Sequence, residues 1–355
     1  MTTALIFNNN HYLHNDPSSE RRYKGRGPFN DERKERIDEL RKELKARYVF
    51  ENPTINVLKE ERLPTLEELT RVHDPKYLEE LEFLSYLEEA TEDPPSRKFF
   101  EEKEGTYFTE HTYTAALSAA GASIELAEHV ARNSGTNGFA LVRPPGHHTR
   151  KDKAAGFCFL NNVALAARAV QALGIERVFI FDFDVHHGDG TESIFENDRS
   201  VFYCSTHQHG TDKEGDLLYP GTGAATNGNK FIKNIPLRAG IGNETYEDLV
   251  RKEVLPTIKK YKPGIILVSA GFDLHRDDPV KEIPTKVTAT GFRKTTRMLL
   301  DTAADVCDGK LVYFLEGGYN TRALSKSVYA CINELSSTKT LYQTPEETTD
   351  LAHRV

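Results

Sequence analysis

Short runs of apolar residues recur along the chain, each long enough for one β-strand but too short for a buried helix. They predict strands at Leu5–Phe7, Phe139–Val142, Val178–Phe183, Val201–Cys204, Phe231–Ile235, Ile265–Ser269 and Leu311–Leu315. Several of these runs are apolar at every position, which is typical of parallel strands that helices cover on both faces.

Apolar residues at helical spacing lie between these runs. The segment Asp31–Arg47 places Ile37, Leu40 and Leu44 on one face, with charged residues elsewhere. Other helices are indicated by a capping box at Thr65 and Glu68, by Asp74 before Pro75, and by alanine-rich segments at Ala115–Arg132 and Asn162–Leu173. Strands that alternate with helices predict an α/β fold with a central parallel sheet flanked by helices.

Two polar segments, 94–105 and 206–230, are expected to be surface loops. Neither resembles a linker, so we expect the whole chain, 1–355, to form a single domain. Its 355 residues can bury a large core without disulfides.

Composition and charge exclude several classes of function. The net charge of −8 argues against direct nucleic-acid binding. The four cysteines are widely spaced and contain no CxxC pair, which argues for free thiols in a reducing compartment. No signal peptide or membrane-spanning apolar run is found, so we expect a cytoplasmic protein with no membrane partner. A homo-oligomer remains an open alternative.

Polar residues that could carry chemistry follow the predicted strands. They are Arg143–His148; Asp182, Asp184, His186, His187 and Asp189; Ser205 and His207; Asp273; and Glu316–Tyr319. Because ligands bind at the carboxyl ends of strands in open α/β sheets, these clusters predict one active site at one edge of the sheet.

The segment 179–190 carries the densest of these clusters. If it continues as an extended strand, Asp182, Asp184 and His186 point to the same side. Asp184 and His186, together with Asp273 from another strand, would form a three-ligand metal site with an open position, as in metal hydrolases. A salt-bridged acidic turn with surface histidines is the alternative, but acidic residues within an apolar strand are costly unless paired or metal-bound.

Histidine and tyrosine side chains would complete such a site. His147 and His148 are candidate proton-transfer groups, because histidine titrates near neutral pH. Asp182 and Asp189 are the natural partners for their far ring nitrogens. Tyr319 could donate a hydrogen bond to a tetrahedral oxyanion.

Six ordered motifs resemble the histone deacetylase superfamily, which also contains acetylpolyamine amidohydrolases and acetoin-utilisation proteins. They are RPPGHH (143–148), GFCFLNN (156–162), DFDVHHGDG (182–190), YPGTG (219–223), SAGFD (269–273) and LEGGYN (315–320). The resemblance runs from about Leu5 to about Leu335. It implies a single-domain arginase/deacetylase fold with a central eight-stranded parallel sheet.

The resemblance also implies roles for individual residues. Asp184, His186 and Asp273 correspond to the zinc ligands, and Tyr319 to the phenol that polarises the acetyl carbonyl. His147 and His148 correspond to the tandem histidines, with Asp182 and Asp189 as their respective partners. His148 would act as general base and then general acid, and His147 would stay protonated.

Further residues match the tunnel and the monovalent-cation sites of the family. The tunnel would be lined by Gly156, Phe157, Tyr219, Val280 and Gly317. One cation site, usually for potassium, would use Asp182, Asp184, His186, Ser205 and Thr206, and a second would use Phe195, Asp198, Val201 and Phe231.

The sequence therefore predicts a zinc-dependent deacetylase that acts on acetyl-lysine in proteins or on a small acetylated amine. An acetylpolyamine amidohydrolase and a longer-chain lysine deacylase remain alternatives, although Val280 stands where a polyamine-selective relative carries a glutamate. Iron(II) and cobalt(II) also suit the ligand set. A two-manganese ureohydrolase is disfavoured because Gly188 stands where a carboxylate ligand would be needed. A non-enzymatic acyl-lysine binder would be expected to lack Tyr319 or a histidine.

Overall fold

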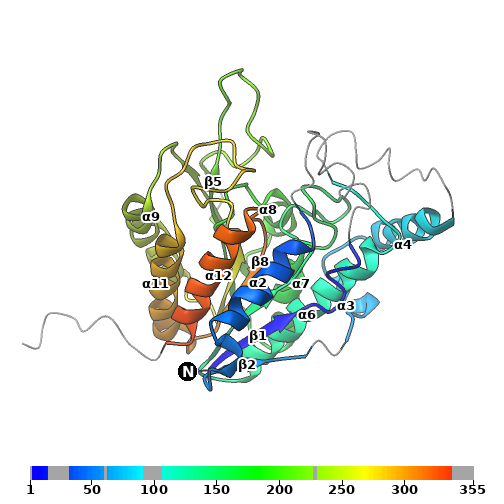
Figure 1. Cartoon of the computed structure of the whole chain (residues 1–355), viewed down its shortest axis with the longest axis horizontal. Coiled ribbons are helices and arrows are strands. Elements are labelled where there is room, and N and C mark those ends of the chain that lie inside the picture. The colour runs from blue at the N-terminus through cyan, green and yellow to red at the C-terminus, as the bar shows by residue number, and fades with distance from the viewer. Residues whose placement is uncertain (1, 15–31, 60–61, 91–105, 227–229, 338–355) are drawn as a thin grey trace, which may run out of the picture.

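One parallel sheet of eight strands, in the order β2-β1-β3-β8-β7-β4-β5-β6, forms the centre of the fold (Figure 1). The strands are β1 (Thr2–Phe7), β2 (Ile55–Val57), β3 (Thr136–Leu141), β4 (Val178–Asp182), β5 (Val201–Gln208), β6 (Ile232–Leu237), β7 (Ile265–Ala270) and β8 (Leu311–Leu315). This computed structural model describes residues 2–14, 32–59, 62–90, 106–226 and 230–337. The loop expected at 94–105 lies outside them.

The seven predicted strands are all present, and the structure differs from the prediction chiefly at β2 and at the end of β5. β2 was not predicted, because its three residues are half-buried or exposed at the edge of the sheet and show no apolar run. β5 extends through Gln208, so the loop prediction for 206–230 is wrong at its start. Ser205, Thr206 and His207 are fully buried there and pair with β6, although they are polar.

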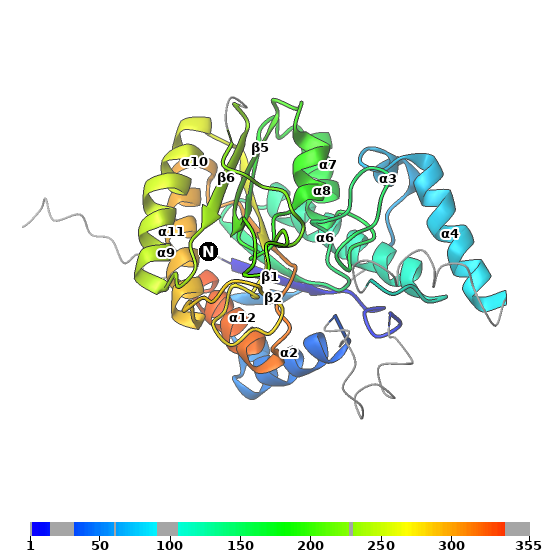
Figure 2. The ribbon, with the colours of Figure 1, turned by 90° about the horizontal axis from the view of Figure 1, so that it is seen from above.

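Helices cover both faces of the sheet (Figure 2). One face carries α2 (Glu35–Ala46), α9 (Asn243–Leu249), α10 (Leu255–Tyr261), α11 (Ala289–Cys307) and α12 (Thr321–Leu335), with a π-helical turn at Val250–Val254 and a 3-10 turn at Val49–Glu51. The other face carries α3 (Leu66–Thr70), α4 (Pro75–Ala90), α6 (Thr112–Arg132), α7 (Asn162–Ala172) and α8 (Asp189–Phe195). The capping box at Thr65 and Glu68 is confirmed.

β4 shows how the sheet is buried on two sides. Phe179 and Phe181 belong to the core on the face that carries α10 and α11, and the Phe179 ring lies 6.3 Å from that of Tyr261 in α10. Val178 and Ile180 belong to the core on the opposite face, where α7 contacts β4. Because successive side chains alternate between faces, a strand covered on both sides must be apolar throughout. The prediction of parallel strands from the continuous apolar runs is therefore confirmed.

The strand order decides where the polar clusters meet. β3, β8, β7, β4 and β5 are consecutive neighbours in the sheet. All pairings are parallel, so their carboxyl ends lie at one edge. These are the five strands that the polar clusters follow. Among the described residues, no helix is both long and apolar enough to cross a membrane.

Candidate active site

Asp182 ends β4, and the chain then turns instead of continuing as a strand. Asp182 Oδ1 accepts a hydrogen bond from the Asp184 N–H at 3.1 Å, and Asp184 Oδ1 accepts one from the His186 N–H at 2.9 Å. The prediction that the three side chains share one side of an extended strand is therefore wrong beyond Asp182. Each carboxylate binds the amide two residues later, which is typical of aspartate in turns.

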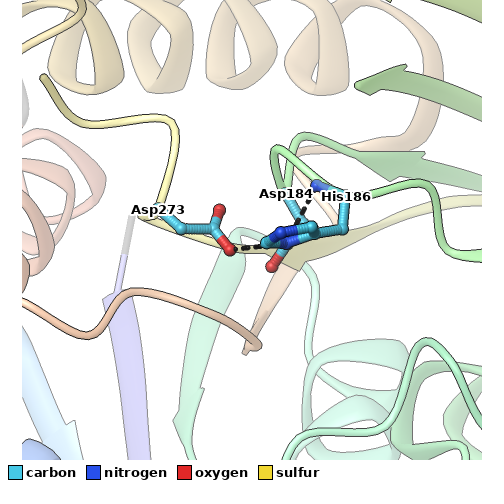
Figure 3. Close-up of side chains that lie close together, drawn as sticks. All are labelled: Asp184, His186 and Asp273. Atoms are coloured by element: carbon cyan, nitrogen blue, oxygen red, sulfur yellow. Dashed lines mark hydrogen bonds and ion pairs between the residues drawn. The ribbon is translucent and has the colours of Figure 1, made fainter. Parts of the chain in front are cut away.

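These turns bring Asp184 and His186 next to Asp273, which follows β7 (Figure 3). One ligand atom of each residue lies within 4.8 Å of the other two, and all three residues are buried. His186 Nδ1 is 3.1 Å from Asp184 Oδ1 and 3.1 Å from Asp273 Oδ2. In the part of the chain that the structure describes, this is the one group of His, Cys, Asp and Glu side chains close enough to hold a metal ion.

The charges in this group fit a divalent cation. Burial and the neighbouring Asp184 charge raise the pKa of Asp273 to about 7. Burial lowers the pKa of His186, but its hydrogen bonds to Asp184 and Asp273 outweigh burial and raise it to about 10. The two carboxylates thus favour a positive charge between them, which a proton supplies here and a metal ion could supply in its place. One imidazole and two carboxylates suit zinc and also accept iron(II) or cobalt(II).

Backbone amides orient both carboxylates. The Gly317 N–H donates to Asp184 Oδ2 at 2.9 Å, and the Val185 N–H donates to Asp273 Oδ1 at 2.9 Å. A Cβ on Gly317 would lie 2.3 Å from Asp273 Oδ2, so only glycine fits there. Gly317, which was predicted to line the tunnel, packs against the ligand carboxylates and is not among the residues that line the cavity.

The tandem histidines differ in their surroundings. His147 Nδ1 is 3.1 Å from Asp182 Oδ2, and His148 Nδ1 is 2.8 Å from Asp189 Oδ1. Burial favours neutral His147, but Asp184 and Asp182 outweigh burial and raise its pKa well above 6.5. Burial and the neighbouring His147 charge lower the pKa of His148 to about 4. At neutral pH the pair therefore offers one cation and one neutral base.

A narrow cavity of about 180 Å³ opens over this site. It is lined by His147, His148, Gly156, Phe157, His186, Tyr219, Val280, Glu282 and Tyr319. Four of the five predicted tunnel residues line it, and Glu282 was not predicted. Phe157 has a left-handed backbone, with φ of 68°. Such a conformation is uncommon for a bulky residue and is often found at ligand sites.

Tyr319 closes one side of the cavity. Its ring meets the Phe157 ring edge to face, with centroids 5.8 Å apart, and the Arg36 guanidinium lies 4.8 Å from its centroid. Burial raises the pKa of the Tyr319 hydroxyl well above 10. The phenol therefore stays protonated and can only act as a hydrogen-bond donor or neutral acceptor at neutral pH.

Comparison with known proteins gives this geometry its context. A family model described as the histone deacetylase domain matches residues 30–335. The chain belongs to the histone deacetylase family. It is 36% identical to "Histone deacetylase 15" of Arabidopsis thaliana over 340 residues, which cover 94% of this chain but 56% of that protein. It is 34% identical to a "Probable deacetylase" of Archaeoglobus fulgidus over 331 residues, which cover 90% of this chain and 82% of the archaeal protein.

A solved structure of the family shares the fold. The crystal structure of the HDA15 HD domain superposes with a TM-score of 0.80 at 36% identity, covering 94% of this chain and 88% of that one. The predicted arginase/deacetylase fold with an eight-stranded parallel sheet is thus confirmed. The family and the fold that the six motifs indicated are both established for this chain.

Two buried charged residues support the site of this deacetylase family member and were not assigned roles from sequence. Glu316 accepts hydrogen bonds from the Gly146 and His147 N–H groups at 2.7 and 3.2 Å and from the Ser269 hydroxyl at 3.1 Å. Arg36 donates to the carbonyls of Gly318, at 2.7 Å, and of Glu316. Arg36 lies one turn before Leu40, on the apolar face of α2. A charged residue on an apolar helix face is the signal in the sequence that could have indicated a buried role for Arg36.

The first predicted set of monovalent-cation residues lies next to the site, and the second lies at the other end of β5. Ser205 pairs with Asp182 across β4 and β5, and its hydroxyl is 2.7 Å from His207 Nδ1. The Thr206 hydroxyl lies 3.0 Å from that of Tyr246. The second set borders the start of β5, at Val201: the Asp198 N–H donates to the Phe195 carbonyl, and the Tyr203 N–H to the Phe231 carbonyl, each at 2.9 Å. Potassium binding at either set stays a prediction.

Proposed function

We propose that the chain is a zinc-dependent deacetylase that hydrolyses the amide of an N-acetylated amine to free amine and acetate. The observation that carries this proposal is the buried Asp184–His186–Asp273 group beneath a narrow cavity whose wall holds His147, His148 and Tyr319. An amide needs carbonyl polarisation, an activated water and a proton donor for the amine, and this site holds a group for each.

Zinc is the metal that we propose for Asp184, His186 and Asp273, with iron(II) and cobalt(II) as alternatives. When bound, the metal would supply Lewis-acid polarisation of the acetyl carbonyl and lower the pKa of water. Potassium at the Asp182–Ser205 set is a further part of the proposal, and cation charge there would offset the buried carboxylates nearby.

His148 is suited to proton transfer. Its Nδ1–H faces Asp189, so the neutral ring presents Nε2 as an acceptor. As the water oxygen bonds to the carbonyl carbon, Nε2 takes the water proton. It then gives that proton to the amine nitrogen as the C–N bond breaks. His147, held protonated by Asp182 and Asp184, stabilises the negative charge that develops.

Tyr319 would stabilise the tetrahedral oxyanion. Its hydroxyl stays protonated because burial raises its pKa, so it can donate a hydrogen bond as the carbonyl oxygen gains charge. The Phe157 and Arg36 contacts fix the ring, so this donor is oriented before substrate binds.

The cavity supports a substrate that enters as a single unbranched chain. A volume of about 180 Å³ is below the usual range for drug-sized ligands, and Phe157, Tyr219 and Val280 give it apolar walls. The methylenes of acetyl-lysine fit this description. A small acetylated polyamine is the second candidate, because Glu282 places a carboxylate in the cavity wall where a distant ammonium group could pair with it. A longer acyl chain remains the third alternative.

The deciding experiment measures kcat/KM of the zinc-loaded protein on three substrates: an acetyl-lysine peptide, N-acetylputrescine and N8-acetylspermidine. Preference for the peptide supports protein deacetylation, and preference for either polyamine supports the second candidate. Activity on none of them with zinc bound, together with activity on a longer acyl-lysine, would point to the third alternative. No activity on any acyl amine would overturn the proposal in favour of an acyl-lysine binder.

A further inference from the structure

Asp278 is a buried carboxylate outside the metal group and the histidine pairs. Its Oδ2 accepts hydrogen bonds from two consecutive backbone amides, those of Tyr319 at 2.7 Å and of Asn320 at 3.0 Å. Its Oδ1 accepts a third from the Val280 N–H at 3.2 Å. All three partners are N–H donors, so the position requires a group that only accepts, which an ionised carboxylate is.

The Tyr319 backbone needs such an anchor because of the chain on either side. Gly318 before it has a left-handed backbone, with φ of 113°, so the chain turns there. Asn320 after it is the N-cap of α12 and accepts from the Ala323 N–H. The amides of Tyr319 and Asn320 therefore fall between a turn and a helix, where neither strand nor helix satisfies them. Asp278 binds both and fixes the point from which the tyrosine ring projects.

The same carboxylate also accepts a hydrogen bond from a residue of the cavity wall. Val280, whose N–H donates to Asp278 Oδ1, lines the cavity, and so does Tyr319. The Asp278 carbonyl also accepts from Lys281 Nζ at 2.6 Å, and the Asn320 side chain donates to the Asp277 carbonyl at 2.9 Å. The segment 277–281 and the Tyr319–Asn320 pair are thus joined by several bonds rather than by one.

We propose that Asp278 is a positioning residue for Tyr319, which holds the tyrosine hydroxyl in its productive place and links it to Val280 in the cavity wall. The proposal rests on the proposed role of Tyr319 as the donor to the oxyanion. A displacement of about 1 Å in such a donor is enough to cost a large part of its effect, because hydrogen bonds weaken steeply with misalignment.

The test is a double-mutant cycle with Asp278→Asn and Tyr319→Phe. Asn keeps the size of the side chain but turns an NH2 group toward a backbone N–H. We expect D278N to lower kcat on the acetyl-lysine peptide about 10–100-fold, because misplacing a catalytic group by about 1 Å can cost about 100-fold, with KM and zinc content little changed. In the Y319F background, where there is no hydroxyl to position, we expect less than about a 3-fold further loss.

Asp277→Asn is the matched control. Asp277 is the preceding aspartate, its side chain is 56% exposed, and its ion pairs with Arg276 and His275 are long, at 3.6 and 3.8 Å. Exposed pairs of this kind contribute little, so D277N should keep kcat within about 2-fold. If D278N does not fold, Asp278→Glu, which keeps the charge and shifts the oxygens by one methylene, takes its place in the cycle.

The outcomes separate this inference from the function on which it rests. An equal loss of kcat from D278N in both backgrounds, or no loss in the wild type, would overturn the positioning role. If instead the wild type is inactive on every acetyl substrate, or Y319F retains full activity, the proposed function or the role of Tyr319 fails. Both of these results come from the wild type and the Y319F single variant, so they do not depend on any substitution of Asp278.

Discussion

His148 Nδ1 lies 2.8 Å from Asp189 Oδ1, while Arg150 Nη2 holds the other carboxylate oxygen of Asp189 at 2.9 Å. Burial would raise the pKa of Asp189, but hydrogen bonds from His148 and Arg150 outweigh burial and lower it to about 2. Asp189 is therefore ionised at neutral pH. It fixes the His148 proton on Nδ1 and leaves Nε2 as the base.

Asp189→Asn tests this relationship. The amide oxygen can still accept from His148, but the charge that strengthens the base is lost, so we expect kcat to fall about 10–100-fold. Asp305→Asn is the matched control. The Asp305 side chain is 61% exposed and pairs with Lys259 at the surface, so its neutralisation should keep kcat within about 2-fold. Wild-type kcat in D189N would show that His148 does not depend on its charged partner.

Tyr319→Phe removes only the hydroxyl. The ring contacts with Phe157 and Arg36 remain, so the fold and the metal group should be unaffected. Loss of one donor to an oxyanion typically lowers kcat about 100–1,000-fold, and we expect that loss here at unchanged zinc content. Measuring kcat and bound zinc on the same preparation checks both statements, and near-normal turnover would refute the oxyanion role.

Metal binding by Asp184 should be visible in thermal stability as well as in activity. A ligand that binds the folded state at about 100 times its Kd adds about 2.7 kcal/mol to the free energy of unfolding, so zinc should raise Tm and a chelator should lower it. In Asp184→Ala, we expect no zinc-dependent shift in Tm and no activity. Asp248→Asn, at an exposed aspartate, should behave as the wild type does. A D184A protein that still binds zinc stoichiometrically would remove Asp184 from the ligand set.

The sequence allowed the fold to be predicted because its apolar runs are unbroken and have the length of single strands. A strand such as Val178–Asp182, buried on both faces, is apolar at all but its last position, and its shortness argues against a buried helix. The site could be predicted for the same reason. Once the strands are parallel, polar residues after β3, β4, β7 and β8 must meet at one edge.

What the sequence could not show are contacts made by tertiary structure alone. The edge strand Ile55–Val57 has no apolar run because one side of it has no neighbour. The turn after Asp182 depends on carboxylate-to-amide bonds that do not alter hydrophobic periodicity. Glu316 and Gly317 follow the same strand, but only the folded chain shows that they pack behind the histidines and the ligand carboxylates.

Glu316 offers a comparison between two substitutions. In Glu316→Gln, the amide oxygen can accept from Gly146 and His147 while its NH2 donates to the Ser269 hydroxyl, so every hydrogen bond has a counterpart. We expect E316Q to retain stability and kcat within about 3-fold. Glu316→Ala leaves buried N–H groups unpaired at about 1–3 kcal/mol each, and it releases the histidine segment.

Urea unfolding and kcat for the two variants check this prediction. E316A should lose about 2–5 kcal/mol of unfolding free energy, from the unpaired amides together with the cavity left by the side chain. Its kcat should fall at least about 10-fold, because a residue that orients catalytic groups is removed. E316A as stable as the wild type would show that these hydrogen bonds do not hold the segment in place.

His73 links folding stability to pH through a residue away from the cavity. It is buried, its Nδ1 lies 3.1 Å from the Arg150 carbonyl, and its Nε2 accepts from the Asn161 N–H at 3.0 Å. Protonation of Nε2 would break the hydrogen bond from the Asn161 N–H, because a protonated ring nitrogen cannot accept. Burial, only partly offset by the bond to Arg150, lowers the pKa of His73 from 6.5 to about 4.

His73 is protonated at a higher pH in the unfolded chain than in the folded protein. Between pH 6.5 and about 4 the unfolded chain binds this proton and the folded chain does not, so the free energy of unfolding falls as pH falls through that window. The contribution of His73 is on the order of 3 kcal/mol, because each pKa unit corresponds to about 1.4 kcal/mol.

Other buried histidines titrate too, so the useful quantity is the difference between the wild type and His73→Gln. Urea unfolding at pH 7.5 and at pH 4.5 should show a larger loss in the wild type than in H73Q. His111→Gln, at a half-exposed histidine, should match the wild type at both pH values. Equal losses in wild type and H73Q would mean that His73 is protonated in the folded protein without cost.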